Sequence, residues 1–309
     1  MRFVILGIAA FGTLIGGTPT GSASAETPAG AAAVGQATPS AAALDLVAKG
    51  ERLFHIGGCT NCHTAKGGAL LAGGDPIVSP DGKWLAYVHR AFFAPNITPD
   101  RETGIGGWST TDFIRAMREG VSPEGDPYYP AFPYTSYTRM SDEDLTALKA
   151  YLDTVPPVRQ LSREHDLGFP FDQRWGMRLW QWLFFEPERF TPDPAKDAVW
   201  NRGAYLAEGP GHCQECHTPR TFYGVRKSDQ AYTGAALGKE KVPDITSDPK
   251  DGLGQWGLGD VVTVLKMGML PDGDFVGSEM AKIVNNGTSK LPDEDIQAIA
   301  AYVKSLPPR

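Results

Sequence analysis

The chain contains Cys59-Thr60-Asn61-Cys62-His63 and, further on, Cys213-Gln214-Glu215-Cys216-His217, two copies of the pattern C-x-x-C-H. These copies include all four cysteines of the 309 residues. The pattern is typical of covalent attachment of c-type haem. Two thiols three positions apart on a helical turn reach the two vinyl groups of one haem, and the adjacent histidine coordinates the iron. We therefore expect two covalently bound haem c groups, one held by Cys59, Cys62 and His63 and the other by Cys213, Cys216 and His217.

Two other uses of these cysteines compete with haem attachment. A redox-active C-x-x-C pair usually accompanies a βαβ pattern, which this sequence lacks. A structural zinc site needs ligands that lie close together, whereas the two cysteine pairs are about 150 residues apart. Both alternatives are therefore weaker than haem attachment.

The sequence around the two motifs is duplicated. Asn96–Asp100 matches Asp244–Asp248 at an offset of 148 residues, and Ser141–Asp144 matches Pro292–Asp295 at an offset of 151 residues. Self-similarity of this kind predicts two copies of one structural unit. With 309 residues and 41% hydrophobic content, the chain is long enough to bury two cores.

Each copy is predicted to be helical. The first helix is expected to carry the haem motif near its end, and the second to start near Ser109 or Leu258. The third is expected to start at Ser141 or Pro292, with acidic residues in its first turn. No run of residues is convincing as a strand. The predicted fold class is all-α, with an irregular shell around each haem.

The N-terminus has the features of a secretory signal peptide over residues 1–25. Arg2 is followed by an apolar run from Phe3 to about Ile15 and by small residues that end in Ala23-Ser24-Ala25. The apolar run is shorter than the roughly 20 residues that span a bilayer, so an uncleaved anchor is the weaker alternative. We expect cleavage after Ala25, export to the periplasm and no transmembrane segment in the mature chain.

Composition divides the remaining residues. Residues 26–41 are rich in Ala, Gly, Pro, Thr and Ser and are predicted to be a flexible linker. We assign 42–157 to the first cytochrome-like domain and 201–309 to the second. Residues 158–200, dense in Trp and Phe, are predicted to be an inter-domain strap that buries its rings against both domains. A partner-docking surface is the alternative for this segment.

The repeat breaks where the second axial ligand of each iron would lie, a position in which Met raises the potential. In the second domain Met280 is expected to lie in a polar loop between the Gly268 turn and the last helix, and it is the predicted ligand. The aligned residue of the first domain is Phe132, which has no donor atom. Met140, eight residues later, is the predicted ligand there, although packing at a helix start explains it equally well. His89 is a weaker candidate.

With these residues in view, the chain resembles the cytochrome c subunits of membrane-bound periplasmic dehydrogenases for alcohols and sugar acids. The resemblance covers roughly residues 45–309. It also rests on three shared stretches, which are Ala94–Asp100, Gly104–Ser109 and Tyr129–Tyr134. It implies two tandem class I cytochrome c domains, each wrapped around one covalent haem, and supports His63, His217 and Met280 as iron ligands.

This chain departs from those subunits in two respects. They typically have three haem domains, where this chain has two. They also typically have Met at the position of Phe132, so the resemblance leaves the first distal ligand open.

Together these features predict a periplasmic dihaem cytochrome c that transfers electrons and catalyses no bond-making of its own. A periplasmic dehydrogenase would be the electron donor, and a cytochrome or terminal oxidase the acceptor. The net charge of −7 provides no basic surface for nucleic acid. The alternative is a dihaem enzyme, a peroxidase or sulfur-compound dehydrogenase, with an open haem beside Phe132. A haem-based ligand sensor is a third possibility.

Overall fold

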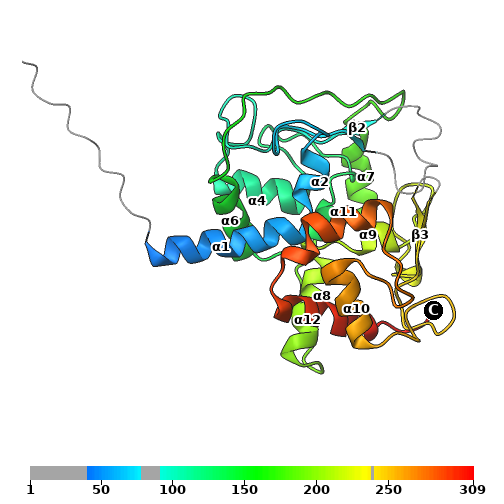
Figure 1. Cartoon of the computed structure of the whole chain (residues 1–309). Helices are drawn as coiled ribbons and strands as arrows, with labels where there is room; N and C mark the ends of the chain where they lie inside the picture. Colours follow the sequence, from blue (N-terminus) through cyan, green and yellow to red (C-terminus); the bar gives the residue numbers. More distant parts are fainter. Residues whose placement is uncertain (1–39, 78–90, 238–239) are drawn as a thin grey trace, which may run out of the picture. The chain divides into compact units, whose positions relative to one another are not determined.

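The computed structural model describes residues 40–77, 91–237 and 240–309, and these residues belong to one compact unit (Figure 1). The predicted signal peptide, nearly all of the predicted linker and His89 lie outside the described residues. The first helix, α1 (Ala41–Ile56), starts at the last linker position, because Ser40 accepts a hydrogen bond from the Ala43 N–H at 3.2 Å. None of the described helices is long and apolar enough to cross a bilayer.

Helices dominate the described residues, in agreement with the predicted all-α class. The first half of the unit (40–157) contains, after α1, the helices α2 (Cys59–His63), α4 (Thr110–Glu119), α5 (Tyr134–Tyr137) and α6 (Asp142–Leu152). The second half (198–309) contains α8 (Ala198–Glu208), α9 (Gln214–His217), α10 (Leu258–Met267), α11 (Ser278–Asn286) and α12 (Asp293–Lys304). Short 3₁₀ turns occupy Ser228–Gln230 and Thr288–Lys290.

Two small antiparallel strand pairs were not expected from the sequence. The first pairs β1 (Pro76–Ile77) with β2 (Phe92–Phe93), and the second pairs β3 (Ala235–Leu237) with β4 (Glu240–Val242). Strands of two or three residues are too short for the alternating pattern by which strands are predicted.

The same helix crossing occurs in both halves. Helix α1 packs across α6, and α8 packs across α12 (Figure 1). A glycine allows the two backbones to touch at each crossing. A Cβ atom on Gly50 would lie 1.9 Å from the carbonyl oxygen of Ala147, and one on Gly203 would lie 1.9 Å from that of Ala298. The duplication in the sequence is thus a duplication of packing geometry.

The turn that follows each motif is also repeated. Leu71 and Tyr232 adopt φ values of 59° and 66°, which are uncommon for residues with a side chain. In each case the backbone N–H donates to a threonine hydroxyl just after the motif, Thr64 or Thr218, at 3.0 Å. Because the two turns share this geometry but not their central residue, the sequence comparison alone did not reveal it.

Each half has its own hydrophobic core. The first includes Leu53, Phe113, Met140, Leu145 and Leu148, and the second includes Leu206, Val261, Ile296, Ile299 and Val303. A third cluster joins the segment between the halves to the first half through Phe92, Tyr129, Tyr134, Leu167, Met177 and Trp180.

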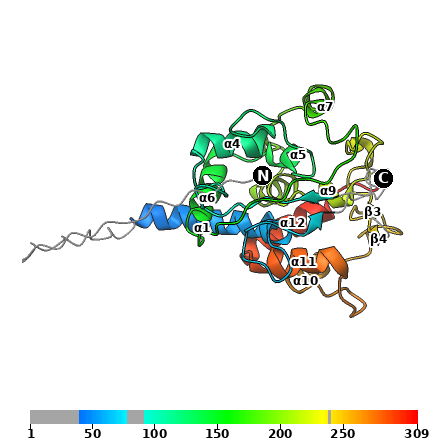
Figure 2. The ribbon, with the colours of Figure 1, turned by 90° about the horizontal axis from the view of Figure 1, so that it is seen from above.

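The segment between the halves differs from the predicted strap. It ends at Asp197, since α8 starts at Ala198, and it contains α7 (Gly176–Phe184). We therefore use "strap" for residues 158–197. Trp180 is buried as expected, but Phe169, Trp175 and Trp182 are 83%, 70% and 79% exposed, so the prediction that the strap buries its rings is wrong for these three. Helix α7 packs Met177 and Trp180 in the third cluster, whereas Leu179, Trp182 and Leu183 are exposed. In Figure 2 this helix lies on the side away from α10 and α11.

Candidate haem sites

Each C-x-x-C-H motif forms a helical turn of its own. The expectation that the motif lies near the end of the preceding helix is wrong in both halves, because α1 and α8 stop before it. Gly58 has a left-handed conformation with φ 57° ahead of α2, and His212 has φ 37° ahead of α9. These residues redirect the chain, so each motif leaves the axis of the helix before it. Glycine adopts this conformation readily, whereas histidine does so only rarely.

Each motif histidine makes the same kind of hydrogen bond, from its Nδ1 atom to the backbone carbonyl of a proline. His63 Nδ1 lies 2.7 Å from the carbonyl oxygen of Pro95, and His217 Nδ1 lies 2.9 Å from that of Pro243. A carbonyl oxygen only accepts, so Nδ1 carries the proton and Nε2 keeps its lone pair. Burial lowers the pKa of both imidazoles, which favours their neutral form. This is the arrangement of a metal-binding histidine oriented by a backbone carbonyl.

The thiols have properties opposite to those of a redox-active pair. Burial raises the pKa of Cys59 and of Cys213 to about 12 and that of Cys216 to about 11. Redox-active C-x-x-C pairs depend on a lowered thiol pKa. Within the described residues, no three His, Cys, Asp or Glu side chains converge as a metal-ligand set. The residues present fit covalent haem attachment.

The predicted distal ligand of the first half is buried in the core of that half. Met140 is 1% exposed and belongs to the same packed cluster as Cys59, Trp108 and Phe132. Its backbone oxygen accepts a hydrogen bond from Arg118 at 2.6 Å. The structure therefore brings a thioether into the core that surrounds the first attachment cysteine, and the same burial gives Met140 a packing role.

The predicted distal ligand of the second half lies on a helix and not in a loop. Met280 is half-buried in the first turn of α11, which begins after Gly277 and ends at Gly287. This helix packs on α10 of its own half and on α2 of the other half. The loop prediction was wrong because nine residues flanked by glycines give only a short periodic signal. The two other methionines of this half, Met267 and Met269, are exposed at the end of α10.

The remaining described histidines have structural contacts. His212 Nε2 lies 3.2 Å from the carbonyl oxygen of Gly57, across the boundary between the halves. His165 accepts a hydrogen bond from the Phe93 N–H at 3.2 Å, and burial lowers its pKa to about 4. The sequence indicated no partner for either residue, because both partners are distant along the chain.

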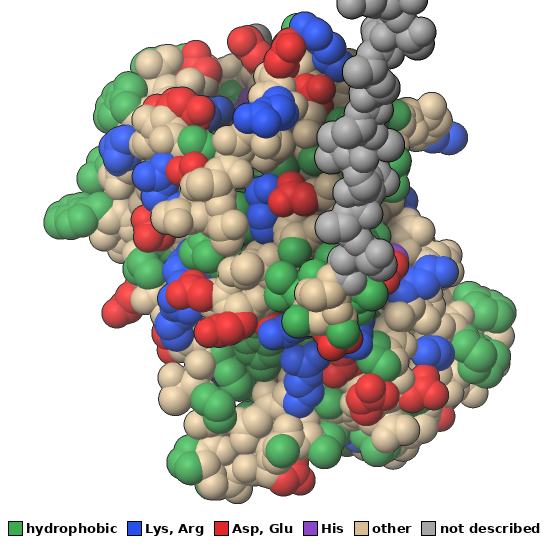
Figure 3. All heavy atoms as spheres, turned by 90° about the vertical axis from the view of Figure 1, so that its left-hand side faces the viewer, with side chains coloured by type: hydrophobic (Ala, Val, Ile, Leu, Met, Phe, Trp, Pro, Cys, Tyr) green, Lys and Arg blue, Asp and Glu red, His purple; other side chains and the backbone are tan. Residues whose placement is uncertain are grey.

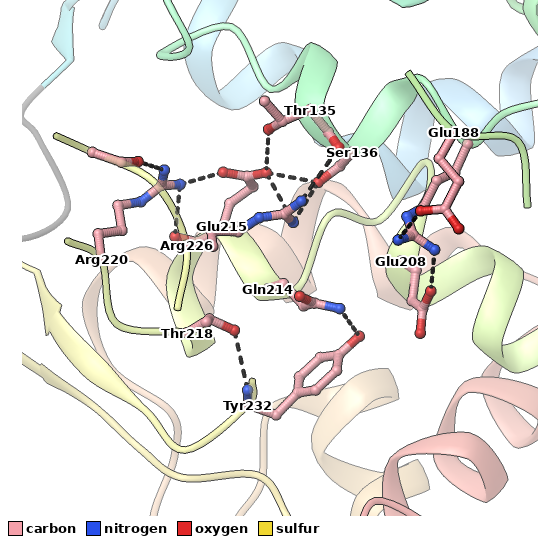
Figure 4. Close-up of polar contacts among 12 residues, drawn as sticks. Thr135, Ser136, Glu188, Glu208, Gln214, Glu215, Thr218, Arg220, Arg226 and Tyr232 are labelled. Atoms are coloured by element: carbon pink, nitrogen blue, oxygen red, sulfur yellow. Dashed lines mark hydrogen bonds and ion pairs between the residues drawn. The ribbon is translucent and has the colours of Figure 1, made fainter. Parts of the chain in front are cut away.

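Sequence reasoning missed the buried ion cluster around Glu215, the third residue of the second motif (Figure 4). Its carboxylate pairs with Arg220 and Arg226 and accepts hydrogen bonds from the hydroxyls of Thr135 and Ser136 at 3.0 and 2.6 Å. Burial opposes the charged form, but the two guanidinium groups and the Ser136 hydroxyl outweigh it and lower the pKa of Glu215 to about 2. A charged residue inside the second motif was the only sequence signal for this cluster.

Comparison with known proteins agrees with this geometry. Residues 47–156, in the first half, match the family model for cytochrome c. The chain is 43% identical to a diheme cytochrome c-type protein of Cereibacter sphaeroides, over 84% of this chain and 85% of that one. The chain therefore belongs to the cytochrome c family. Together with the two motifs, this supports two covalently bound haem c groups per chain, as predicted.

Subunits of larger oxidoreductases are also among the relatives. The chain is 40% identical to the cytochrome c subunit of a quinone alcohol dehydrogenase of Gluconacetobacter polyoxogenes, over 85% of this chain and 56% of that one. It is 39% identical to the gluconate 2-dehydrogenase cytochrome c subunit of Pantoea cypripedii, over 84% of this chain and 59% of that one. The chain thus spans little more than half the length of these subunits, and the resemblance inferred from the sequence is confirmed.

Proposed function

We propose that this protein is a periplasmic dihaem cytochrome c with two tandem class I domains, residues 42–157 and 201–309. Cys59 and Cys62 with His63 would hold one haem, and Cys213 and Cys216 with His217 the other. Bound haem supplies one-electron chemistry. The observation that carries the proposal is the repeated hydrogen bond from each motif histidine to a proline carbonyl, which leaves Nε2 free to bind iron.

The distal methionines are part of this proposal. A second axial ligand from Met280 and from Met140 would make both irons six-coordinate, which suits electron transfer and leaves no open position for a substrate. The burial of Met140 in the cluster around Cys59 supports this role. Periplasmic location is supported by the signal-peptide pattern of residues 1–25.

We also propose that the electron donor is a dehydrogenase and that the acceptor is a cytochrome or terminal oxidase. The donor is supported by the names of two relatives, which are cytochrome c subunits of dehydrogenases. The exposed rings of Phe169, Trp175 and Trp182 are candidates for contact with this partner, because aromatic residues are enriched in protein interfaces. On the face of the molecule shown in Figure 3, acidic and basic side chains are mixed and neither charge dominates.

The proposal is tested by counting haems and their spin states. A pyridine haemochrome assay with intact mass should find two haems per chain, and Cys213→Ala should disrupt the attachment of the second. Optical and electron paramagnetic resonance spectra should show two low-spin haems. A chemical reductant should reduce both haems, and the protein should convert no substrate. A single haem per mature chain, or peroxidase activity at a high-spin haem, would overturn the electron-carrier function.

A further inference from the structure

The third residue of each haem motif contacts the opposite half of the molecule. Glu215 of the second motif accepts a hydrogen bond from Ser136 of α5 at 2.6 Å. Asn61 of the first motif accepts one from the Asn286 amide of α11 at 2.7 Å. Thr135, the neighbour of Ser136 and a second donor to Glu215, lies between the Gly120 turn and the last helix of the first half, and Asn286 lies between the Gly268 turn and the last helix of the second. The two contacts are therefore reciprocal, as in an interface between two related copies.

Other contacts strengthen this reciprocal arrangement. His212, next to the second motif, reaches the carbonyl oxygen of Gly57 next to the first. His55 Nδ1 lies 3.3 Å from the carbonyl oxygen of Asn286.

The two reciprocal contacts differ in strength. The carboxylate of Glu215 is buried and has four partners, two of them guanidinium groups. Arg226 itself also bridges the halves, since it donates to the Ser136 hydroxyl at 3.0 Å and to the Thr135 carbonyl at 3.2 Å (Figure 4). The Asn61 contact is a single amide hydrogen bond. Removing one member of a buried ion cluster leaves uncompensated charge and is far more disruptive than losing one neutral hydrogen bond.

We propose that Glu215 and Asn61 are positioning residues that fix the two haem-binding turns relative to each other. Glu215 holds α9 against α5 of the first half, and Asn61 holds α2 against α11 of the second half. The Glu215 cluster provides most of the constraint. This inference rests on the proposed function, because a fixed spacing between the two turns matters for electrons that pass from one site to the other. One electron leaves one iron and arrives at the other, and no proton or bond change accompanies it. A rigid contact keeps rearrangement between the two sites small.

The experiment compares variants on both sides of the contact. Glu215→Gln keeps the shape of the side chain and removes its charge, Ser136→Ala removes one cross-half hydrogen bond, and Asn61→Ala removes the weaker contact. The matched control is Glu294→Gln, an exposed carboxylate in the first turn of α12. Each holoprotein is assayed for haem content, for hydrogen exchange of the α5 and α9 amides, and for the rate of electron equilibration between the haems after one is photoreduced.

We expect Glu215→Gln to retain both haems, because every cysteine remains. It should lower the equilibrium constant for folding by roughly a hundredfold. It should also speed amide exchange in α5 and α9 and slow inter-haem equilibration. Ser136→Ala should show the same changes to a smaller extent, Asn61→Ala the smallest, and Glu294→Gln none.

Wild-type amide exchange and wild-type inter-haem rates in haem-replete Glu215→Gln would overturn the inference. If that variant does not mature, the same result in Ser136→Ala would overturn it. Absence of electron exchange between the haems of the wild-type protein would instead contradict the proposed function, and hydrogen exchange would still decide the positioning role.

Discussion

In the first half of the molecule, the candidate distal sulfur belongs to Met140, which is fully buried in the hydrophobic core of that half. In the second half it belongs to Met280, which is half-buried on a surface helix that also touches the opposite half. The proximal sides of the two sites, in contrast, share their histidine hydrogen bond and the turn that follows. The difference teaches that duplication preserved the segments close to each motif and let the distal segments diverge.

The proximal and distal sides differ in how far apart along the chain their contacting residues lie. The proximal hydrogen bond joins residues only 32 or 26 positions apart, inside one repeated segment. The distal segments also make the contacts between the halves, through α5 on one side and α11 on the other. Each distal segment contacts the motif of the opposite half, but α5 spans four residues and α11 spans nine, so their helix positions differ.

The largest expected effect is a loss of stability when the glycine at either helix crossing, a feature that both halves share, is replaced. Gly50→Ala and Gly203→Ala each place a Cβ atom 1.9 Å from a carbonyl oxygen at the helix crossing, so the helices must separate. Each substitution should lower the free energy of unfolding by about 3 kcal/mol, the upper range for overpacking. Denaturant unfolding of both variants measures this.

The control for this prediction is Gly259→Ala in α10, where an added Cβ has no neighbour within 4 Å. It should leave stability unchanged or raise it by up to about 1 kcal/mol, since alanine favours helix. Wild-type stability in only one of the two crossing variants would show that the halves do not share the same packing constraint.

The next prediction concerns the candidate distal methionines, whose positions differ between the halves. Met140→Leu and Met280→Leu keep side-chain volume and remove the sulfur, so each should lower stability by less than about 1.5 kcal/mol. If both methionines bind iron, each variant loses one sulfur-to-iron absorption band and gains one high-spin haem that binds carbon monoxide. The potential of that haem should also fall, because a methionine ligand raises it.

Near-infrared and electron paramagnetic resonance spectra check these outcomes. An unchanged spectrum in Met140→Leu would assign Met140 to packing alone and leave the first iron with an open position. The dihaem enzyme, with peroxide or reduced sulfur compounds as substrates, would then become the function to test.

The last prediction is a pH dependence of the contact between the strap and the first half, where His165 accepts a hydrogen bond from the Phe93 N–H. Burial, aided by Arg174, lowers the pKa of His165 to about 4, while an unfolded histidine titrates near 6.5. Between these values the unfolded chain takes up a proton that the folded chain does not. Stability should therefore be fully present above pH 6.5 and decrease as the pH falls towards 4, on the order of 2 kcal/mol in total.

Urea unfolding between pH 4.5 and 7 should show this slope in the wild-type protein and a flatter one in His165→Gln. Carboxylates titrate in both proteins, so the difference between the two curves isolates the histidine. Parallel curves would mean that His165 is protonated in the folded protein and that the strap is less tightly bound to the first half.

The sequence by itself determined the chemistry of the attachment sites and the helical scaffold. The motif spacing encodes two thioethers and an iron ligand within one turn, so it can be recognised without any structure. The helices that begin after Ser109, Ser141 and Pro292 were predicted correctly, because capping residues and acidic first turns are local signals. The duplication predicted that both halves would repeat the same packing.

Only the tertiary structure decided what surrounds these sites. Ser136 and Glu215 are 79 positions apart, and nothing in either local sequence indicates the other. Likewise, Trp180 is buried and its indole N–H donates to the Tyr223 carbonyl, whereas Trp182, two residues later, is 79% exposed. The sequence of the strap alone does not distinguish these two rings. Covalent haem attachment depends on neighbours within five residues, whereas burial and charge pairing depend on which distant surfaces meet, and folding alone brings those surfaces together.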